Sequence, residues 1–256
     1  MSTGARRRVP SPAAGRLRPL PFAVLAWLLA AGIALADDPA KEFWPEVDTW
    51  WRVSPAWRLS LFVPISENLD TQYREGNLIP QVDVAFGTAH RERRLLDEDR
   101  ARAMTMFLFR GGYLGGKSLD DQGEAYTEHT PFAELHWRLP VKGGFLLSQR
   151  LRTEFRWLGQ DNPEFSSRLR YRLMLEKEYT VGRVSLVPYV NVEPYYDSRY
   201  DTVNRIRLIP GASVSWTRYA AIEGNLTYQH DSKSSATHTV ALNVILHVFL
   251  DTSRTP

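Results

Sequence analysis

The alternation of side chains between Phe145 and Lys177 constrains the fold of this chain more than any other feature. One set of alternate positions is mainly apolar and consists of Leu147, Gln149, Leu151, Thr153, Phe155, Trp157, Ser167, Leu169, Tyr171, Leu173 and Leu175. The intervening positions are mainly polar and consist of Ser148, Arg150, Arg152, Glu154, Arg156, Arg168, Arg170, Arg172, Met174 and Glu176. Because a strand sends successive side chains to opposite faces, the segment predicts a hairpin with one apolar and one charged face.

Two environments suit such a hairpin. In a water-soluble sheet the apolar face would meet a core and the charged face bulk water. In an outer-membrane barrel the apolar face meets lipid and the charged face lines the lumen. The chain favours the barrel, because it holds about eleven segments of roughly ten residues, the length of a tilted membrane-spanning strand. Besides the two arms of the hairpin, these are Phe43–Val53, Trp57–Ile65, Ile79–Thr88, Met104–Tyr113, Phe132–Leu139, Val184–Tyr196, Asn204–Trp216, Ala221–Gln229 and Thr237–Leu250.

The connections between these segments alternate between short turns and longer polar loops, as they do between the two sides of an outer-membrane barrel. The longer loops are expected at Ser66–Asn77, Gly111–Thr130, Tyr195–Thr202 and His230–Ala236, and a charged linker at His90–Arg102. Aromatic residues flank the short turns, where rings would lie at the lipid–water boundary. They are Trp50, Trp51, Trp57, Trp137, Phe145, Tyr179, Trp216 and Tyr219.

The strand count is a difficulty. An even number is the rule for bacterial barrels, so about eleven segments predict an antiparallel transmembrane barrel of about 10–12 strands, with twelve favoured. A hidden extra strand, two merged strands or closure through a parallel pair would each resolve the parity. Pro64, Pro188 and Pro210 fall inside strands, where each removes a hydrogen-bond donor, and bulges are expected to absorb them.

The start of the chain predicts export. A basic stretch with Arg6, Arg7, Arg8, Arg16 and Arg18 precedes an apolar run at Pro21–Leu35 that is too short to span a bilayer as a helix. Ala34-Leu35-Ala36 supplies the small residues that a signal peptidase needs. The sequence therefore predicts a cleaved signal peptide at 1–36, a barrel domain at 37–256 and a location in the Gram-negative outer membrane, with a short membrane anchor as the alternative to cleavage.

Charge and composition exclude several function classes. The formal charge is +3, and removal of the five leader arginines leaves −2, so a basic pI is no argument for a nucleic-acid partner. The chain has no cysteine, which excludes disulfides and thiolate metal sites. No metal-ligand spacing stands out and no cofactor is predicted, because His136 and His247 are single strand histidines.

The arginine faces suggest a function. Guanidinium groups remain charged and bind carboxylates and phosphates, and rings of arginine bias a narrow pore toward anions. The predicted lumen and anion-binding residues are Arg150, Arg152, Glu154, Arg156, Arg168, Arg170, Arg172, Glu193, Arg205 and Arg207. Glu154 is expected near Arg170. A small porin-like channel for anionic solutes is one reading. The other is a structural or surface-binding barrel whose lumen is filled by arginine–carboxylate pairs.

An enzyme is not the favoured interpretation. His230-Asp231-Ser232 has the His-x-Ser spacing of outer-membrane lipid A deacylases, in which a histidine activates a serine. Both residues are expected in a polar loop, and no acidic residue follows on the next strand to orient the histidine.

The expected partners of the barrel are outer-membrane lipid and lipopolysaccharide, the barrel-assembly machinery and a small anionic solute.

Four arginine-rich motifs resemble an uncharacterised family of Gram-negative outer-membrane β-barrels that carries a domain of unknown function. They are Arg152-Thr153-Glu154-Phe155-Arg156, Arg168-Leu169-Arg170-Tyr171-Arg172, Pro188-Tyr189 with Glu193, and Asn204-Arg205-Ile206-Arg207. The resemblance is best from Phe145 to Trp216 and implies a location and a fold, but no activity.

Overall fold

The computed structural model describes residues 39–251, except 55, 87–105, 121–126, 160–161, 183, 218 and 235–236. The leader and the charged linker at His90–Arg102 therefore lie outside the described residues. The elements are β1 (Ala40–Arg52), β2 (Trp57–Asn68), β3 (Arg74–Phe86), β4 (Met106–Ser118), β5 (Thr127–Val141), β6 (Phe145–Leu158), β7 (Glu164–Lys177), β8 (Tyr179–Val181), β9 (Val184–Asp197), β10 (Thr202–Ser215), β11 (Ala220–Asp231) and β12 (His238–Asp251). None of these described segments is a helix with the length and hydropathy to cross a membrane.

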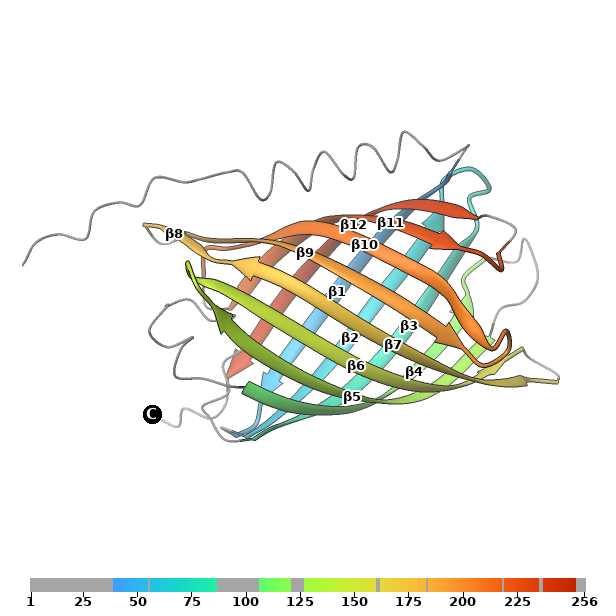
Figure 1. Cartoon of the computed structure of the whole chain (residues 1–256), viewed down its shortest axis with the longest axis horizontal. Helices are drawn as coiled ribbons and strands as arrows, with labels where there is room; N and C mark the ends of the chain where they lie inside the picture. Colours follow the sequence, from blue (N-terminus) through green and yellow to red (C-terminus); the bar gives the residue numbers. More distant parts are fainter. Residues whose placement is uncertain are drawn as a thin grey trace, which may run out of the picture.

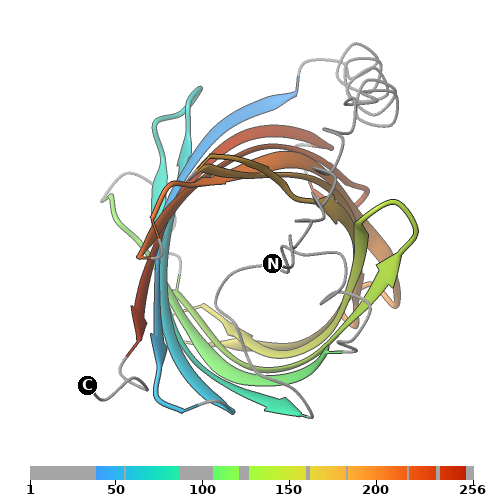
Figure 2. The same ribbon diagram turned by 90° about the vertical axis from the view of Figure 1, so that its left-hand side faces the viewer.

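The strands form one sheet that closes into a barrel with tilted strands (Figures 1 and 2). Consecutive strands pair in antiparallel fashion, except that β8 pairs with β9 alone, and β9 pairs with β7 on one side and β10 on the other. The ring is closed by β1 and β12, which run parallel, so that Ala40 lies beside Thr239 and Arg52 beside Asp251. The barrel is therefore mixed and eleven-stranded, with one extra short strand. The preference for twelve antiparallel strands was wrong. The parallel pairing of β1 with β12 allows a ring with an odd number of strands to close.

The extra strand, β8, is a continuation of β7. Glu176 pairs with Tyr189 and Tyr179 with Leu186, so the register against β9 is the same before and after the break. The break lies opposite Pro188, which has no backbone N–H to give to the ladder. One missing donor thus divides a single long strand into two.

The other in-strand prolines are accommodated in the same way. Pairing between β2 and β3 lapses near Pro64 and resumes in the same register. The β10–β11 ladder likewise lapses at Pro210 and resumes unchanged. The expected bulges are absent at both prolines, and the register shift in β10 falls instead between Val203 and Arg205. Each of these prolines therefore interrupts the pairing with one neighbouring strand and leaves the register unchanged.

The inside of the barrel is polar and its outside is apolar, as the alternation predicted. On β6, Leu151 and Phe155 are 37% and 45% exposed, whereas Arg152 and Glu154 are 7% and 0% exposed. The same division holds on β3, where Asp83 is fully buried. The charged face therefore points inward, and the apolar side chains form the outer surface.

Several strands are longer than the sequence predicted. The expected loops at Ser66–Asn77, Gly111–Thr130 and Tyr195–Thr202 supply the ends of β2 to β5, β9 and β10. Glycine explains part of the error, since Gly112 allows the ring of Phe132 to pack against its backbone. A Cβ added at Gly112 would lie 2.4 Å from that ring. Glycine thus marks a close contact in a strand here rather than a turn.

The aromatic residues near the first short turn divide between the two faces. Trp51 and Trp57 are 47% and 51% exposed on the outer surface. Trp50 points inward instead, with its ring edge against Phe62 at a centroid distance of 4.7 Å and the Arg58 guanidinium 4.1 Å above it. The expectation of a boundary position is therefore wrong for Trp50.

Candidate functional site: a charged lumen

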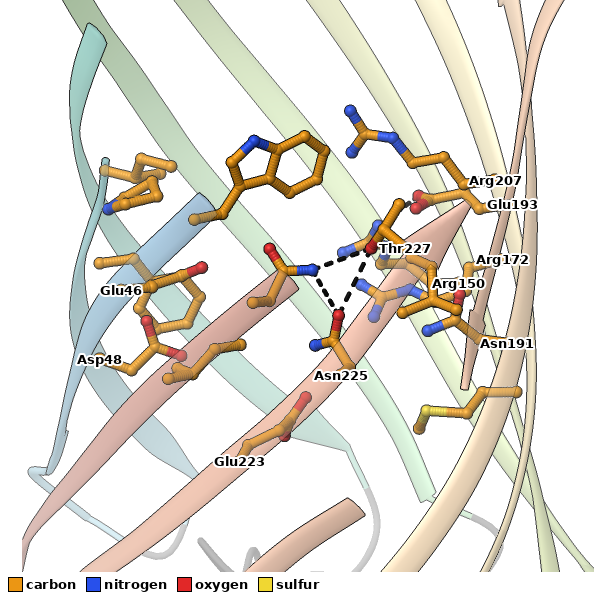
Figure 3. Close-up of a pocket in the computed structure, with 18 of the residues that line it drawn as sticks. Glu46, Asp48, Arg150, Arg172, Asn191, Glu193, Arg207, Glu223, Asn225 and Thr227 are labelled. Atoms are coloured by element: carbon orange, nitrogen blue, oxygen red, sulfur yellow. Dashed lines mark hydrogen bonds and ion pairs between the residues drawn. The ribbon is translucent and has the colours of Figure 1, made fainter. Parts of the chain in front are cut away.

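A cavity of about 760 Å³ lies inside the barrel and is lined by side chains from every strand of the ring. Nine arginines and seven carboxylates of the described residues contribute to its lining. Figure 3 shows part of this lining, with acidic residues of β1 and β11 on one side and arginines of β6, β7 and β10 on the other. The arrangement of these charges decides what the cavity can bind.

The first part of an ion-pair network spans β2 to β5. Asp83 lies between two arginines, with its Oδ2 2.5 Å from Arg58 Nη2 and its Oδ1 2.6 Å from Arg110 Nε. Arg110 also reaches Glu134, 3.3 Å away. Buried charges need partners of this kind, because desolvation of an unpaired ion is costly.

The network continues on β6 and β7. Glu134 Oε1 lies 3.0 Å from Arg152, and Glu154 contacts Arg152 at 2.6 Å, Arg168 at 2.5 Å and Arg170 at 3.0 Å. The expected contact between Glu154 and Arg170 is confirmed. Glu154, Arg168 and also Arg156 belong to the barrel wall and do not line the cavity.

Two further carboxylates on β9 hold arginines that the sequence singled out. Glu193 forms ion pairs with Arg150 and with Arg170, the latter at 3.0 Å. Arg156 lies 2.9 Å from Glu128 and 3.6 Å from Asp197. These pairs link β5, β6, β7 and β9 into one charged wall.

The arginines of β10 differ from one another. Arg205 lies 2.6 Å from Asp231 on β11. Arg207 donates from Nε to Gln229, 2.7 Å away, and its guanidinium lies 5.0 Å from the ring centre of Trp44. Arg207 and Arg172 line the cavity, and neither forms an ion pair with a carboxylate of the described chain.

An acidic wall was missed by the sequence reasoning. His247 Nδ1 lies 3.2 Å from Asp48, and its Nε2 lies 3.3 Å from Glu223. Glu46 lines the cavity beside them (Figure 3). The signal was the acidic residues at alternate positions of β1, Glu42, Glu46 and Asp48.

A polar belt separates the acidic and basic walls. Asn243 donates from Nδ2 to Thr227 Oγ1, 2.8 Å away, and to Asn225 Oδ1 (Figure 3). All three residues line the cavity. These amide and hydroxyl groups can exchange partners with a polar solute or with water.

The remaining motifs lie away from the cavity wall. His230 belongs to the outward set of β11, with its ring 5.0 Å from that of His238. Ser232 Oγ donates to the Asn204 carbonyl, 3.3 Å away, so its hydroxyl is not directed at the imidazole. Among the described residues, no group of three or more histidine and carboxylate side chains is placed so that it could hold a metal ion. At the N-terminal end of β3, hydrogen bonds from Arg74 lower the pKa of Asp120.

Comparisons with known proteins place the chain in a family without an assigned activity. No curated protein and no solved structure matches it. A family profile described as "protein of unknown function (DUF2490)" matches residues 65–240, which include all four arginine-rich motifs and more than half of the chain. The chain therefore belongs to the DUF2490 family.

Proposed function

We propose that this protein is an outer-membrane channel that admits small anionic solutes. The observation that carries the proposal is the inverted polarity of the barrel, whose arginines and carboxylates point inward while its outer surface is apolar. In water, exposure of that apolar surface would cost a large free energy, whereas contact with the hydrocarbon of a membrane would not. The basic and apolar leader supports the same location, because it has the features of an export signal.

The outer surface supports membrane insertion in detail. Leu169 and Leu173 of β7 are 42% and 40% exposed, and Leu242 and Leu246 of β12 are 50% and 40% exposed. Closure of the ring pairs every strand, so backbone groups need no water. Outer-membrane lipid, lipopolysaccharide and the barrel-assembly machinery are the partners that such a protein would meet.

The cavity supports the channel role. The ion-pair network runs along the wall of the barrel and leaves a cavity of about 760 Å³ beside it. Arg172 and Arg207 face that cavity without a carboxylate partner, so a passing anion can approach them without displacing an existing ion pair. Cationic groups in a low-dielectric passage favour anions over cations.

A second candidate is a structural barrel with a closed lumen. It is favoured by the extent of the ion-pair network, in which Glu134, Glu154 and Glu193 each contact at least two arginines. Such a network stabilises a wall without any need for transport.

Recording from purified barrel in planar bilayers tests the proposal. We expect stable conductance and, in a salt gradient, a reversal potential that favours anions. Arg172→Gln combined with Arg207→Gln should reduce this preference. The double variant Arg74→Gln with Arg199→Gln is the matched control, since it removes the same charge outside the cavity. Absence of conductance would support the closed barrel, and fractionation of the protein with soluble periplasmic markers would remove both candidates.

A further inference from the structure

A cluster of inward-facing polar side chains adjoins Met174 on β7. Ser148 of β6 and Asn191 of β9 are its register partners on the two neighbouring strands. Arg172 is the preceding inward residue of β7, and Arg150 of β6 is the register partner of Arg172. All five residues line the cavity, and Figure 3 shows Arg150, Arg172 and Asn191 together on one side of it. These five residues are called the Met174 cluster below.

Four buried polar atoms of the Met174 cluster have no hydrogen-bond partner in the described chain. They are Ser148 Oγ, Arg150 Nε, Arg172 Nε and Asn191 Oδ1. Arg172 Nε could donate to Asn191 Oδ1, yet neither atom has a partner, so the two side chains do not satisfy each other. Ser148 and Asn191 are only 8% and 3% exposed. Because a buried polar group without a partner is costly, a solute that supplies the missing partners is stabilised here.

The two arginines of the Met174 cluster differ in their partners. Arg150 forms ion pairs with Glu193 and, at 3.5 Å, with Glu134. Arg172 has neither an ion pair nor a hydrogen bond with any residue that the structure describes. Its terminal Nη groups therefore remain available to an anion. A carboxylate suits them, because it accepts two parallel hydrogen bonds from one guanidinium group.

Glu193 is the carboxylate that the register between β7 and β9 places level with Arg172. Its Oε1 atom forms ion pairs with Arg150 and Arg170, the latter at 3.0 Å. Its Oε2 atom accepts a hydrogen bond from Tyr195, 3.2 Å away. Both oxygens therefore have partners, and Arg172 is not one of them.

The row of register partners that crosses the Met174 cluster contains no carboxylate. From β6 to β10 the row consists of Ser148, Met174, Asn191 and Ile209. An anion that approaches Arg172 along this row meets two polar and two apolar side chains rather than a competing negative charge. Glu176, the next inward residue of β7, does not line the cavity.

We propose that the Met174 cluster binds small hydroxycarboxylates, with the carboxylate on the Arg172 guanidinium and a hydroxyl against Asn191 and Ser148. A hydroxyl both donates and accepts, so it can donate to Asn191 Oδ1 and accept from Ser148 Oγ. Met174 offers a flexible apolar surface to the hydrocarbon part of the solute. The inference rests on the proposed channel, and it names the class of anion that the channel would select.

Three four-carbon probes test the inference: 3-hydroxybutyrate, butyrate and 1,3-butanediol. Each is titrated against the full barrel in two ways, as a blocker of the current in planar bilayers and by calorimetry in detergent. 3-Hydroxybutyrate should bind and block at about fivefold lower concentration than butyrate, because it forms an additional hydrogen bond. 1,3-Butanediol should bind more weakly than butyrate, since it brings no charge to Arg172.

Two variants separate the contributions of the charge and the amide. Asn191→Leu should lower the affinity for 3-hydroxybutyrate to that for butyrate, and Arg172→Gln should weaken both to the level of 1,3-butanediol. Asn77→Leu is the matched control and should retain the preference for 3-hydroxybutyrate. Asn77 also lines the cavity and has an Oδ1 atom without a partner in the described chain, but three strands lie between β3, which carries it, and β7.

The two readouts separate the inference from the channel proposal. Conductance with equal affinities for 3-hydroxybutyrate and butyrate would overturn the inference and leave the anion channel intact. A silent bilayer with preferential binding of 3-hydroxybutyrate in calorimetry would overturn the channel and support the site. Loss of the preference in Asn77→Leu would contradict the assignment to the Met174 cluster. The comparison of probes on the unaltered chain decides the inference even if a substitution prevents folding.

Discussion

Arg152 and Arg170 lie directly opposite each other on neighbouring strands, and a single oxygen of Glu154 lies 2.6 Å from one guanidinium and 3.0 Å from the other. Like charges in direct cross-strand register repel. The Glu154 carboxylate lies between the two guanidinium groups and offsets this repulsion. The Glu154 side chain is fully buried. Glu154 therefore contributes directly to the stability of this part of the wall, beside Glu134 and Glu193.

Replacement of Glu154 by glutamine should lower the free energy of unfolding by about 3–5 kcal/mol, because Arg168 loses its ion-pair partner and Arg152 and Arg170 each lose one of two. Urea titration of the detergent-folded barrel, followed by circular dichroism, measures the change. Glu164→Gln is the control, since Glu164 is exposed at the start of β7. Equal effects of the two substitutions would show that the bridge does not stabilise the wall.

Leu173 lies on the outer surface near the middle of the span formed by β7 and β8. If lipid contacts this surface, Leu173→Arg should cost about 2–4 kcal/mol in the free energy of unfolding from bilayers. Val181→Arg, at the end of β8, should cost about 0–1 kcal/mol because it lies at the boundary. A soluble barrel would tolerate both changes within about 0.5 kcal/mol, which would refute membrane insertion.

Gly112 and Gly111 form a natural pair of test positions on β4. An added Cβ at Gly112 would meet Phe132 at 2.4 Å and Gln81 at 3.0 Å, whereas nothing lies within 4 Å at Gly111. Gly112→Ala should therefore cost about 1–3 kcal/mol from overpacking, measured by the same urea titration, and Gly111→Ala should be close to neutral. Recovery of stability in Gly112→Ala with Phe132→Leu would identify the ring as the cause.

The parallel seam predicts a specific crosslink. Thr49 and Val248 are register partners on β1 and β12. Because the chain has no native cysteine, the double variant Thr49→Cys with Val248→Cys should form one disulfide, seen as a change in gel mobility without reductant. Thr49→Cys with Val244→Cys should not, since Val244 pairs with Pro45. The opposite pattern would disprove the observed closure.

The faces of the strands were predictable because they depend only on local alternation. Leu151 and Arg152 point to opposite sides in any strand, so the arginines of adjacent strands could be assigned to one face of the sheet. The closure of β1 on β12 was not predictable, because it depends on pairing between residues about two hundred positions apart, and local pattern carries no such information.

The acidic wall was missed for a related reason. Glu46 and Asp48 form an acidic wall only together with Glu223 and His247, which lie on strands far along the chain. The alternate acidic positions of β1 are evident in the sequence, but the sequence does not show that Glu223 and His247 lie beside them. Glu193, in contrast, was identified because it accompanies Pro188-Tyr189 in one of the motifs that carry the family resemblance.

The accessibility of two spin labels tests the central claim most directly. The cysteine-free chain allows Leu151→Cys, on the outer face, and Ser148→Cys, in the cavity lining, to be labelled separately in bilayers. Oxygen concentrates in hydrocarbon, whereas a nickel chelate stays in water. We expect collisions with oxygen to dominate at position 151 and not at position 148. Dominant collisions with the nickel chelate at position 151 would contradict the account, because lipid would then not contact the apolar face.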